Sequence, residues 1–537
     1  MTNEKKISRR NFAKTAATGI VGLAVGAGIG YGAASMAKPP AAPGGTSTVT
    51  STVTKTAAAV GAQFPFNLPR EGATVAERAV NAAKFVLEQN PDWKGEELVL
   101  ACVGGYENGF NAMIPFWEEA TGVPVTVVTT PLPDFFDKMM VEAVSKSGDI
   151  DLLNAQAMYF CDLAEAGLLA ELDDVAMWID IREHGRPDGY IYPLNFSIPK
   201  YAGKLYGFLQ DGDVQTLYYR EDWLKDPQEM TAFERENGYP LDVPITMKEY
   251  NDMCRFFTRP DDDVWGDSSG RELTRNCFTY YLFVGGTKWP NWYYFDDSMN
   301  AQLTSAEAIM AGEMFLENTK YGHPSLPELS GQAPYSIFAE GRAAFILSAP
   351  STSRVIQDPA ADSRNNWNTA PIPGYWVDGP DGKILNRRSV NLASWSLCVS
   401  NYSKKKDLAM CAGAFFSDGD MLVEAMCAAG TWHDPTRYTH VGPNAPAKLK
   451  DLRGPVLNAF LPNAEIMQPM LQGILGATEY NTTLSKTLHG AMLGAYDNVT
   501  ALEDANKTWN EITDRMGKAK QLTAWRELKK FYPTISL

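Results

Sequence analysis

Two groups of polar side chains follow apolar runs near the start of the chain, at the points where predicted strands end. The first group is Tyr106, Glu107 and Asn108, after residues 97–103, and the second is Gln156 and Tyr159, after residues 148–153. The carboxyl ends of parallel strands meet at one edge of a sheet, where open α/β sheets bind their ligands. Carboxylate, amide and phenol groups at such an edge can bind the hydroxyl groups of a polar solute.

A second candidate for ligand contacts is an unusually aromatic run. It reads Trp289-Pro290-Asn291-Trp292-Tyr293-Tyr294. Flat aromatic rings pack against the C–H faces of a sugar, while its hydroxyl rim requires carboxylates and amides. The run therefore predicts either a platform for a ligand, formed by Trp289, Trp292 and Tyr293, or part of a hydrophobic core. Of two further tryptophans, Trp432 is expected in a cleft and Trp395 in the core.

The sequence matches known catalytic and metal-binding motifs only in part. Residues 266–270 match the G-x-S-x-G nucleophile pattern, but three aspartates precede them where that motif needs a strand, so a polar loop is expected. Residues 261–272 match part of a calcium-binding loop, with Trp265 and Ser268 at unsuitable positions. We expect no catalytic residue, no cofactor and no metal ion, with calcium at residues 261–272 as the open alternative.

Composition narrows the class of protein further. The chain has 537 residues, a net charge of -16 and 45% hydrophobic residues, which suit a soluble two-domain protein and argue against nucleic-acid or anionic-lipid partners. Seven cysteines occur without a C-x-x-C pair, which argues against a zinc ribbon or a thioredoxin-like site. We expect most of them to be buried thiols.

The amino terminus has the features of an export signal. Arg9 and Arg10 precede a Gly/Ala-rich apolar segment, and residues 1–37 therefore resemble a Tat signal with a cleavage site at Ser35-Met36-Ala37. Residues 38–60 are rich in Pro, Ser and Thr and are expected to form a tether. The protein is expected outside the cytoplasm, at the cell surface or in the periplasm, either released or held by an uncleaved signal helix.

The next part of the chain predicts an α/β lobe and a crossing from it to a second lobe. Strands over residues 97–103, 123–129 and 148–153 alternate with helices ending near residues 121, 145 and 166, as in a doubly wound sheet. Gly203-Lys204 predicts a tight turn, and strands are expected at residues 205–209 and 216–219. The polar residues 210–215 between these strands, with Gly212 to allow a bend, predict the crossing.

Residues 203–222 resemble the hinge of family 1 extracellular solute-binding proteins, the carbohydrate receptors of ABC importers. Its pattern is roughly G-K-x-Y-G, a polar crossing, then Y-Y-N-K-D. Further similar segments follow the family's order: 116–125, 148–172, 244–250, 338–345, 371–374, 400–409 and 415–417. In one of these, Thr246 and Glu249 predict a capping box at a helix start. Residues 389–393 depart from the family, which usually has glycines there.

The resemblance implies further ligand contacts. Asp213 occupies the place where maltodextrin-binding relatives carry a sugar-binding acid, and Asp211 beside it is expected to contact the ligand or cap the crossing. Ser351 replaces an aromatic residue of the relatives, and Asn391 lies in the segment that departs from the family. The relatives' sugar-stacking tryptophan aligns with Ala155, so that platform is absent here.

The fold implied by the resemblance is a two-lobed, periplasmic-binding-protein-like (type II) α/β fold with a multi-strand hinge. Residues 97–212 plus 392–429 are expected in lobe 1, and residues 213–391 plus 430–537 in lobe 2. The implied function is that of a monomeric receptor that captures a sugar or oligosaccharide by hinge closure and delivers it to the permease subunits of an ABC importer. The alternatives are a secreted glycan hydrolase with Asp/Glu pairs, or a binding protein for another polar solute such as a glycerol-phosphate compound.

Overall fold

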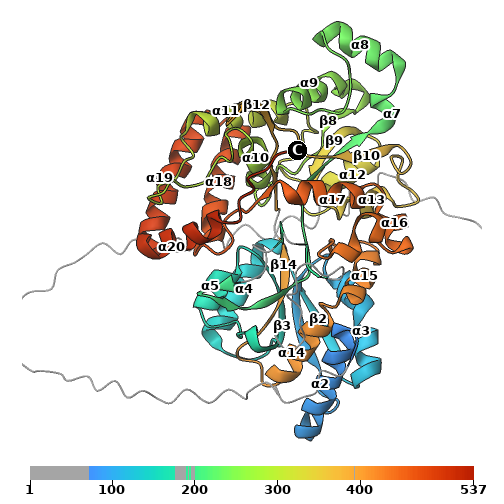
Figure 1. Ribbon diagram of the computed structural model, residues 1–537, viewed down its shortest axis with the longest axis vertical. Coiled ribbons are helices and arrows are strands. Elements are labelled where there is room, and N and C mark those ends of the chain that lie inside the picture. The colour runs from blue at the N-terminus through green and yellow to red at the C-terminus, as the bar shows by residue number, and fades with distance from the viewer. Residues whose placement is uncertain (1–71, 176–188, 192, 195–199, 392–393) are drawn as a thin grey trace, which may run out of the picture. The chain divides into compact units, whose positions relative to one another are not determined.

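Apolar strands and amphipathic helices alternate from Leu98 onward, as predicted for the first lobe (Figure 1). The computed structural model describes residues 72–537, except for residues 176–188, 192, 195–199 and 392–393. The predicted export signal and tether lie outside the described residues. All of the described residues belong to one compact unit, Ala62–Leu537.

The first sheet has five strands in the order β2-β1-β3-β14-β6. Their bounds are β1 Leu98–Val103, β2 Val125–Thr130, β3 Leu152–Gln156, β6 Gly207–Leu209 and β14 Trp395–Val399. β1 pairs in parallel with β2 and β3, whereas β14 runs antiparallel to β3 and β6. β1 and β3 are buried almost throughout because helices cover both faces.

Helices flank this sheet on both sides. Their bounds are α2 Val75–Gln89, α3 Glu107–Thr121, α4 Leu132–Ser145, α5 Phe160–Glu165, α14 Lys406–Phe415 and α15 Gly419–Cys427. In Figure 1, α4 and α5 lie to one side of the strands and α3 to the other. β3 begins at Leu152, later than the predicted start at residue 148, and the Asp151 carboxylate before it accepts a hydrogen bond from the Val99 backbone N–H at 2.9 Å.

The second sheet has four strands in the order β10-β7-β9-β8. Their bounds are β7 Thr216–Arg220, β8 Trp265–Asp267, β9 Ala343–Ser348 and β10 Trp367–Ala370. The polar loop expected at residues 266–270 is wrong for residues 266 and 267, which lie in β8, whereas residues 268–270 form no helix or strand. Asp267, Ser268 and Ser269 are wholly buried. Short hydrogen-bonded pairs supplement the sheets. They are β4 Lys200–Tyr201 with β5 Lys204–Leu205, β11 Tyr375–Gly379 with β12 Gly382–Asn386, and β13 Ser389–Val390 with β15 Met467–Gln468.

Most of the remaining helices surround the second sheet or extend beyond it. Their bounds are α7 Glu221–Leu224, α8 Pro227–Asn237, α9 Met247–Phe257, α10 Asn276–Gly285, α11 Ala306–Thr319, α12 Ala333–Ala339, α13 Thr352–Ile356, α16 Ala447–Arg453, α17 Val456–Glu465, α18 Ala477–Met492, α19 Asn498–Met516 and α20 Lys518–Lys529. The capping box predicted for α9 is confirmed. The Glu249 backbone N–H donates to the Thr246 hydroxyl at 3.2 Å, and the Thr246 N–H donates to the Glu249 carboxylate at 3.0 Å.

The crossing between the two sheets contains residues 210–215, which lie beside the chain segment at Val390 and Asn391. Residues 210–215 lead from β6 to β7, and the Gln215 N–H donates to the Val390 carbonyl at 3.1 Å. The predicted turn at Gly203 is confirmed by its φ of 81° between β4 and β5. Gly212 is required by close approach, since a Cβ there would lie 2.0 Å from the Pro435 carbonyl oxygen. The positive φ, 46°, belongs instead to Asp213.

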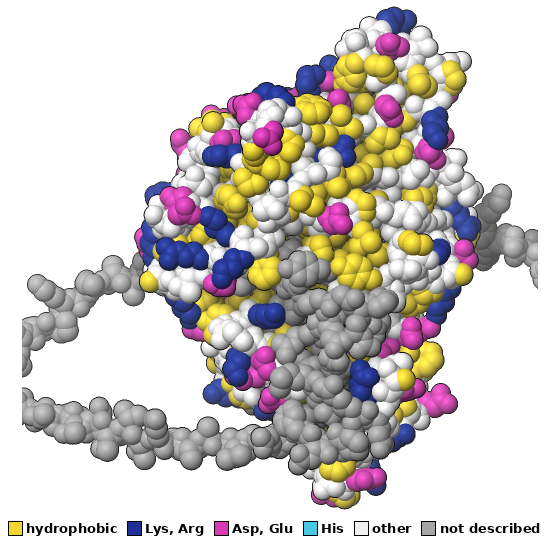
Figure 2. Space-filling view, viewed as in Figure 1, with side chains coloured by type: hydrophobic (Ala, Val, Ile, Leu, Met, Phe, Trp, Pro, Cys, Tyr) yellow, Lys and Arg dark blue, Asp and Glu magenta, His cyan; other side chains and the backbone are white. Residues whose placement is uncertain are grey.

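The described residues also bear on the expectations for surface charge, membrane-spanning helices and cysteines. Figure 2 shows charges of both signs over one face, with Lys and Arg side chains gathered over α20. Among residues 72–537 as described, no helix combines the length and the apolar character needed to cross a membrane. All seven cysteines are free thiols and six are buried, which confirms the expectation of mostly buried thiols.

Candidate ligand-binding site

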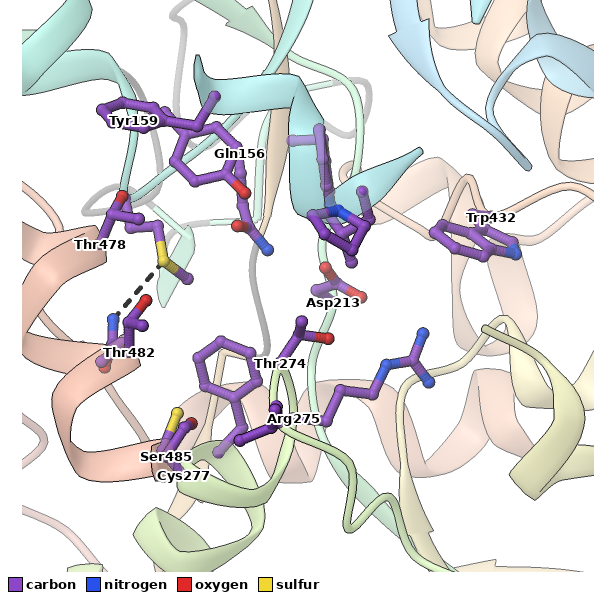
Figure 3. Close-up of a pocket in the computed structure, with 18 of the residues that line it drawn as sticks. Gln156, Tyr159, Asp213, Thr274, Arg275, Cys277, Trp432, Thr478, Thr482 and Ser485 are labelled. Carbon is purple, nitrogen blue, oxygen red and sulfur yellow. Dashed lines mark hydrogen bonds between the residues drawn. The ribbon is translucent and has the colours of Figure 1, made fainter. Parts of the chain in front are cut away.

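A cavity of about 420 Å³ lies between segments that belong to the two sheets (Figure 3). On one side it is lined by residues that follow β1 and β3 and by the start of α4. On the other it is lined by residues before and within α10 and by α18. Six of the predicted contacts line it together: Tyr106, Gln156, Tyr159, Asp213, Ser351 and Trp432.

The first sheet supplies an aromatic wall. The Tyr106 ring centroid lies 4.9 Å from that of Trp395 and 5.8 Å from that of Trp432. Gly105 makes this packing possible, because it has a φ of 106° and a Cβ there would come within 2.5 Å of the Trp432 indole. Trp395, expected in the core, is buried and also lines the cavity.

The wall formed by α18 was not found from the sequence. Thr478, Thr482 and Ser485 lie along one side of the cavity in Figure 3, opposite Asp213 and Trp432. Their spacing of four and three residues places them on one face of the helix. This polar stripe, T-x-x-x-T-x-x-S, is a signal that could have identified them, but only after the helix had been placed beside the first sheet.

Arg275 contributes a buried positive charge, which the sequence analysis also missed. Its guanidinium donates to the Tyr335 hydroxyl at 2.9 Å, and its Nε lies 3.7 Å from a Glu272 carboxylate oxygen. It also lies 5.8 Å from the Trp432 ring centroid. Arg275 is therefore held in place by contacts to residues of the second-sheet side before any ligand is bound.

Three buried carboxyl groups meet at the floor of the cavity. Side-chain oxygens of Asp211, Asp213 and Asp434 lie within 4.8 Å of one another, and Asp213 is the member that lines the cavity. The Tyr106 hydroxyl donates to Asp211. Arg453, itself fully buried, forms an ion pair with Asp434 at 3.0 Å. These three oxygens could surround a cation, but the Arg453 guanidinium already neutralises one of them.

The environment of this acidic cluster disfavours its charged form. Burial, followed by the negative charge of Asp434, raises the pKa of Asp213 to about 8. Burial and the charges of Asp213 and Asp434 raise the pKa of Asp211 well above its usual range. Burial also raises the pKa of Asp434 to about 7, although Arg453 opposes this shift. The cluster therefore holds protons near neutral pH, and these protons belong to the group rather than to single residues.

Four predicted contacts lie close to the cavity but do not line it. The Glu107 carboxylate accepts a hydrogen bond from the Gly105 N–H, and Asn108 donates to the Gly430 carbonyl at 3.3 Å. Asp211 lies behind Asp213, and Asn391 donates to the Gly212 carbonyl at 2.7 Å. The structure thus gives these residues contacts to the backbone or to other side chains around the site.

The aromatic run at residues 289–294 packs elsewhere, with helices at the carboxyl-terminal end. Trp292 is 2% exposed and its indole N–H donates to the Ser305 hydroxyl at 3.0 Å. The Tyr293 ring lies 4.9 Å from that of Tyr532, and the Arg388 guanidinium lies 5.9 Å from the Trp289 ring. None of these three aromatic residues lines the cavity. Of the two interpretations of this run, the arrangement favours the hydrophobic core.

The chain matches a known protein family. Residues 104–417 match the family described as bacterial extracellular solute-binding protein, which is more than half of the chain. A search of curated protein sequences finds no significant match.

Solved structures with the same fold cover most of the chain. The maltose-bound MalE3 of T. maritima aligns with a TM-score of 0.64 at 16% identity, covering 78% of this chain and 100% of that one. An ABC transporter solute-binding protein of Agrobacterium radiobacter K84 in complex with ribitol gives 0.63 at 17% identity, covering 78% and 99%. One from Agrobacterium vitis S4 with bound D-mannitol gives 0.61 at 17% identity, covering 79% and 99%. At these identities the likeness shows the fold, and it confirms the predicted two-lobed α/β architecture.

Proposed function

The chain belongs to the family of bacterial extracellular solute-binding proteins, and we propose that it is the receptor of an ABC importer for a sugar or oligosaccharide. The observation that carries this proposal is the cavity of about 420 Å³, which combines aromatic rings with hydroxyl, amide and carboxyl groups. That combination suits a solute with apolar C–H faces and a polar rim. Maltose, ribitol and D-mannitol in the structurally similar proteins support the same ligand class.

Capture is proposed to occur by closure of two lobes about the crossing. The predicted lobes are residues 97–212 plus 392–429 and residues 213–391 plus 430–537. Gln156 and Tyr159 reach the cavity from the first lobe, and Thr478 and Ser485 reach it from the second. A ligand that contacts both lobes stabilises the closed state by its extra contacts there, which shifts the population toward closure. The permease subunits are proposed to recognise that closed state.

Specific roles follow from the positions of the lining residues. Asp213 is proposed to bind a ligand polar group at the floor, and Gln156 and Ser351 to bind hydroxyl groups. Tyr106 and Trp432 are proposed to pack against the apolar faces of the ligand. Each hydroxyl buried on closure needs a partner, because an unpaired buried polar group costs about 1–3 kcal/mol. A solute with a mismatched hydroxyl pattern is therefore rejected.

Export and assembly complete the proposal. The protein is proposed to be a monomer outside the cytoplasm that reaches its location by the Tat route, on the evidence of Arg9 and Arg10. Replacing both arginines by lysine is expected to leave the protein in the cytoplasm, which cell fractionation measures. Efficient export of the twin-lysine variant would contradict the Tat assignment without affecting the ligand proposal.

The receptor assignment is tested at Asp213. Mass spectrometry of solute released from the purified protein identifies a ligand, and calorimetry then measures its affinity for the wild type and for Asp213→Ala. Loss of the proposed contact between Asp213 and the ligand is expected to weaken binding at least about 100-fold, with folding intact. Asp381→Ala, an exposed aspartate in the β11–β12 turn, is the matched control. Unchanged affinity in Asp213→Ala would reject this role for Asp213.

Hinge closure is tested separately by X-ray scattering. The radius of gyration of the wild type is expected to fall when the identified ligand is added and to stay constant for the Asp213→Ala variant. A radius that does not change on saturation of the wild type would rule out closure as the mode of capture.

A further inference from the structure

The charges around the cavity floor do not balance. Four carboxyl groups are at most 6% exposed there: Asp211, Asp213, Asp434 and Glu272. Among the described residues, the buried cations in contact with this group are Arg275 and Arg453. Fully ionised, the floor would carry two more negative than positive charges in a region shielded from water. Burial of unpaired charge is so unfavourable that the imbalance must be met by protons or by a bound cation.

Both guanidinium groups are already engaged. Arg453 pairs with Asp434 at 3.0 Å, and it also donates to the backbone carbonyls of Pro350 at 3.2 Å and Met426 at 3.0 Å. Arg275 is directed to Glu272 and to the Tyr335 hydroxyl. Neither arginine forms an ion pair with Asp211 or Asp213 within 4.0 Å. Oδ1 of Asp211 is also fully buried and has no hydrogen-bond partner among the described residues.

Other titratable groups near the floor do not correct the imbalance. The Tyr106 hydroxyl is neutral, and burial raises its pKa further. The His433 ring lies 5.1 Å from that of Tyr106, and burial together with Arg453 lowers the pKa of His433 to about 3, so it carries no charge at neutral pH. Asp137 and Lys486 line the cavity at exposed positions, where water and salt screen their charges.

The walls above Asp213 also suit a positive charge. Tyr106, Tyr159, Trp395 and Trp432 bring four aromatic rings to the same cavity. The electron-rich faces of tyrosine and tryptophan attract cations, most strongly where water is excluded. The Arg275 guanidinium lines the same cavity and lies 5.8 Å from the Trp432 ring centroid. The rings that remain for a cation of the ligand are those of Tyr106, Tyr159 and Trp395.

We propose that the solute carries a protonated amine, which binds against Asp213 beneath the aromatic walls, and that the ligand class is an amino sugar. This inference rests on the proposed receptor function and narrows its substrate class. The cationic nitrogen takes the place of a proton shared within the acidic cluster, and that proton leaves to solvent when the ligand binds. Hydroxyl groups of the same sugar are then available to Gln156 and to the polar stripe of α18.

A matched pair of disaccharides tests the inference. The β-1,4-linked glucosamine disaccharide and cellobiose differ only in carrying an ammonium or a hydroxyl group at C2 of each ring. Calorimetry at pH 6.5 is expected to show the amine binding at least about tenfold more tightly, with a salt-insensitive preference because the site is buried. Repeating the titration in buffers of different ionisation enthalpy is expected to show about one proton released per amine bound and none for cellobiose.

The Asp213→Asn variant identifies the group responsible. It keeps the size of the side chain and removes its charge, so it is expected to reduce the preference for the amine to about threefold or less, whatever it does to the affinity for each disaccharide. Asp381→Asn serves as the control and is expected to keep the full preference. A preference that persists in Asp213→Asn would overturn the assignment to this carboxyl group.

The remaining outcomes separate this inference from the receptor proposal. If cellobiose binds as tightly as the glucosamine disaccharide, the amine inference is wrong and the receptor function stands. If neither disaccharide binds, the amine inference is also rejected for this ligand size. Ligand-dependent compaction with the co-purified solute would then still uphold the receptor function.

Discussion

Two buried arginine–aspartate pairs in this protein have the same chemistry and different surroundings. Arg271 and Asp267 form a pair at 2.8 Å inside the second-sheet region, and Arg453 and Asp434 form one at 3.0 Å beside the cavity. All four side chains are at most 1% exposed. The Asp267 carboxylate also accepts hydrogen bonds from the Tyr250 hydroxyl at 2.5 Å and the Ser269 hydroxyl at 2.6 Å.

The difference lies in what else surrounds each aspartate. Asp267 has neutral donors around it in addition to Arg271, so both oxygens of its carboxylate have partners. Asp434 has two further carboxyl groups within 4.8 Å, and one of them, that of Asp211, has a buried Oδ1 without a hydrogen-bond partner among the described residues. The Asp267 carboxylate is therefore satisfied within its own region, whereas that of Asp434 is crowded by like charges next to a cavity. This comparison suggests that unsatisfied buried charge, rather than buried charge as such, marks the ligand-binding floor.

Removing the cation from the Arg271–Asp267 pair is expected to have the largest effect. Arg271→Met leaves Asp267 buried without its partner and should lower the free energy of unfolding by roughly 3–5 kcal/mol. Arg255→Met is the control, because Arg255 is 46% exposed and lies 3.6 Å from Glu236 in a surface pair worth about 0–1 kcal/mol. Urea unfolding followed by fluorescence measures both. Equal effects in the two variants would contradict the structural role of the Arg271 pair.

Neutralising one aspartate in each place is expected to give effects of opposite sign. Asp267→Asn weakens three contacts to a carboxylate and should destabilise the protein by about 2–3 kcal/mol. Asp211→Asn removes one of three crowded carboxyl groups and should stabilise the ligand-free protein at pH 8. Thermal unfolding at pH 8 measures both changes. A loss of stability in Asp211→Asn similar to that in Asp267→Asn would show that the acidic cluster is a structural site.

The pH dependence of stability provides a smaller and more general test. Because the folded-state pKa of Asp213 is raised to about 8, the native state binds more protons than the unfolded state between about pH 4 and pH 8. Stability is therefore expected to fall as the pH rises through this range, by at most about 1.4 kcal/mol per pH unit for each such carboxyl group. Asp213→Asn should flatten this slope, and Asp381→Asn should not. An unchanged slope in Asp213→Asn would place the bound protons elsewhere.

The smallest expected effect is the difference between two serine substitutions, one at Ser269 beside Asp267 and one at Ser351 beside the cavity. The Ser269 hydroxyl donates to Asp267 and accepts from the Leu347 N–H at 2.8 Å, so Ser269→Ala should cost about 1–2 kcal/mol. Ser351, which contacts Asp434, lines the cavity, where water can replace a lost hydroxyl group. Ser351→Ala should therefore change stability less and ligand affinity more. The reverse ranking, measured by unfolding and calorimetry, would remove the distinction between the two regions.

Local sequence determined a large part of this fold. Strand β1, helices α3 and α4, the turn at Gly203 and the capping box of α9 depend on hydrophobic periodicity and on residues within a few positions of one another. The same local order led to Tyr106, Gln156 and Tyr159, because residues that follow parallel strands must meet at one sheet edge. The family itself was visible from the order of short segments along the chain.

Tertiary structure alone decided which distant residues face the cavity. Nothing in the local sequence distinguishes the aromatic residues 289–294, which pack with the carboxyl-terminal helices, from Trp395, which lines the cavity. Asp434 and Arg453 lie more than 200 residues after Asp211, and α18 lies more than 300 residues after β3, so their meeting depends on how the two sheets pack. The electrostatic character of the floor arises from that packing, because a carboxyl group changes its pKa only when other charges approach it and water is removed.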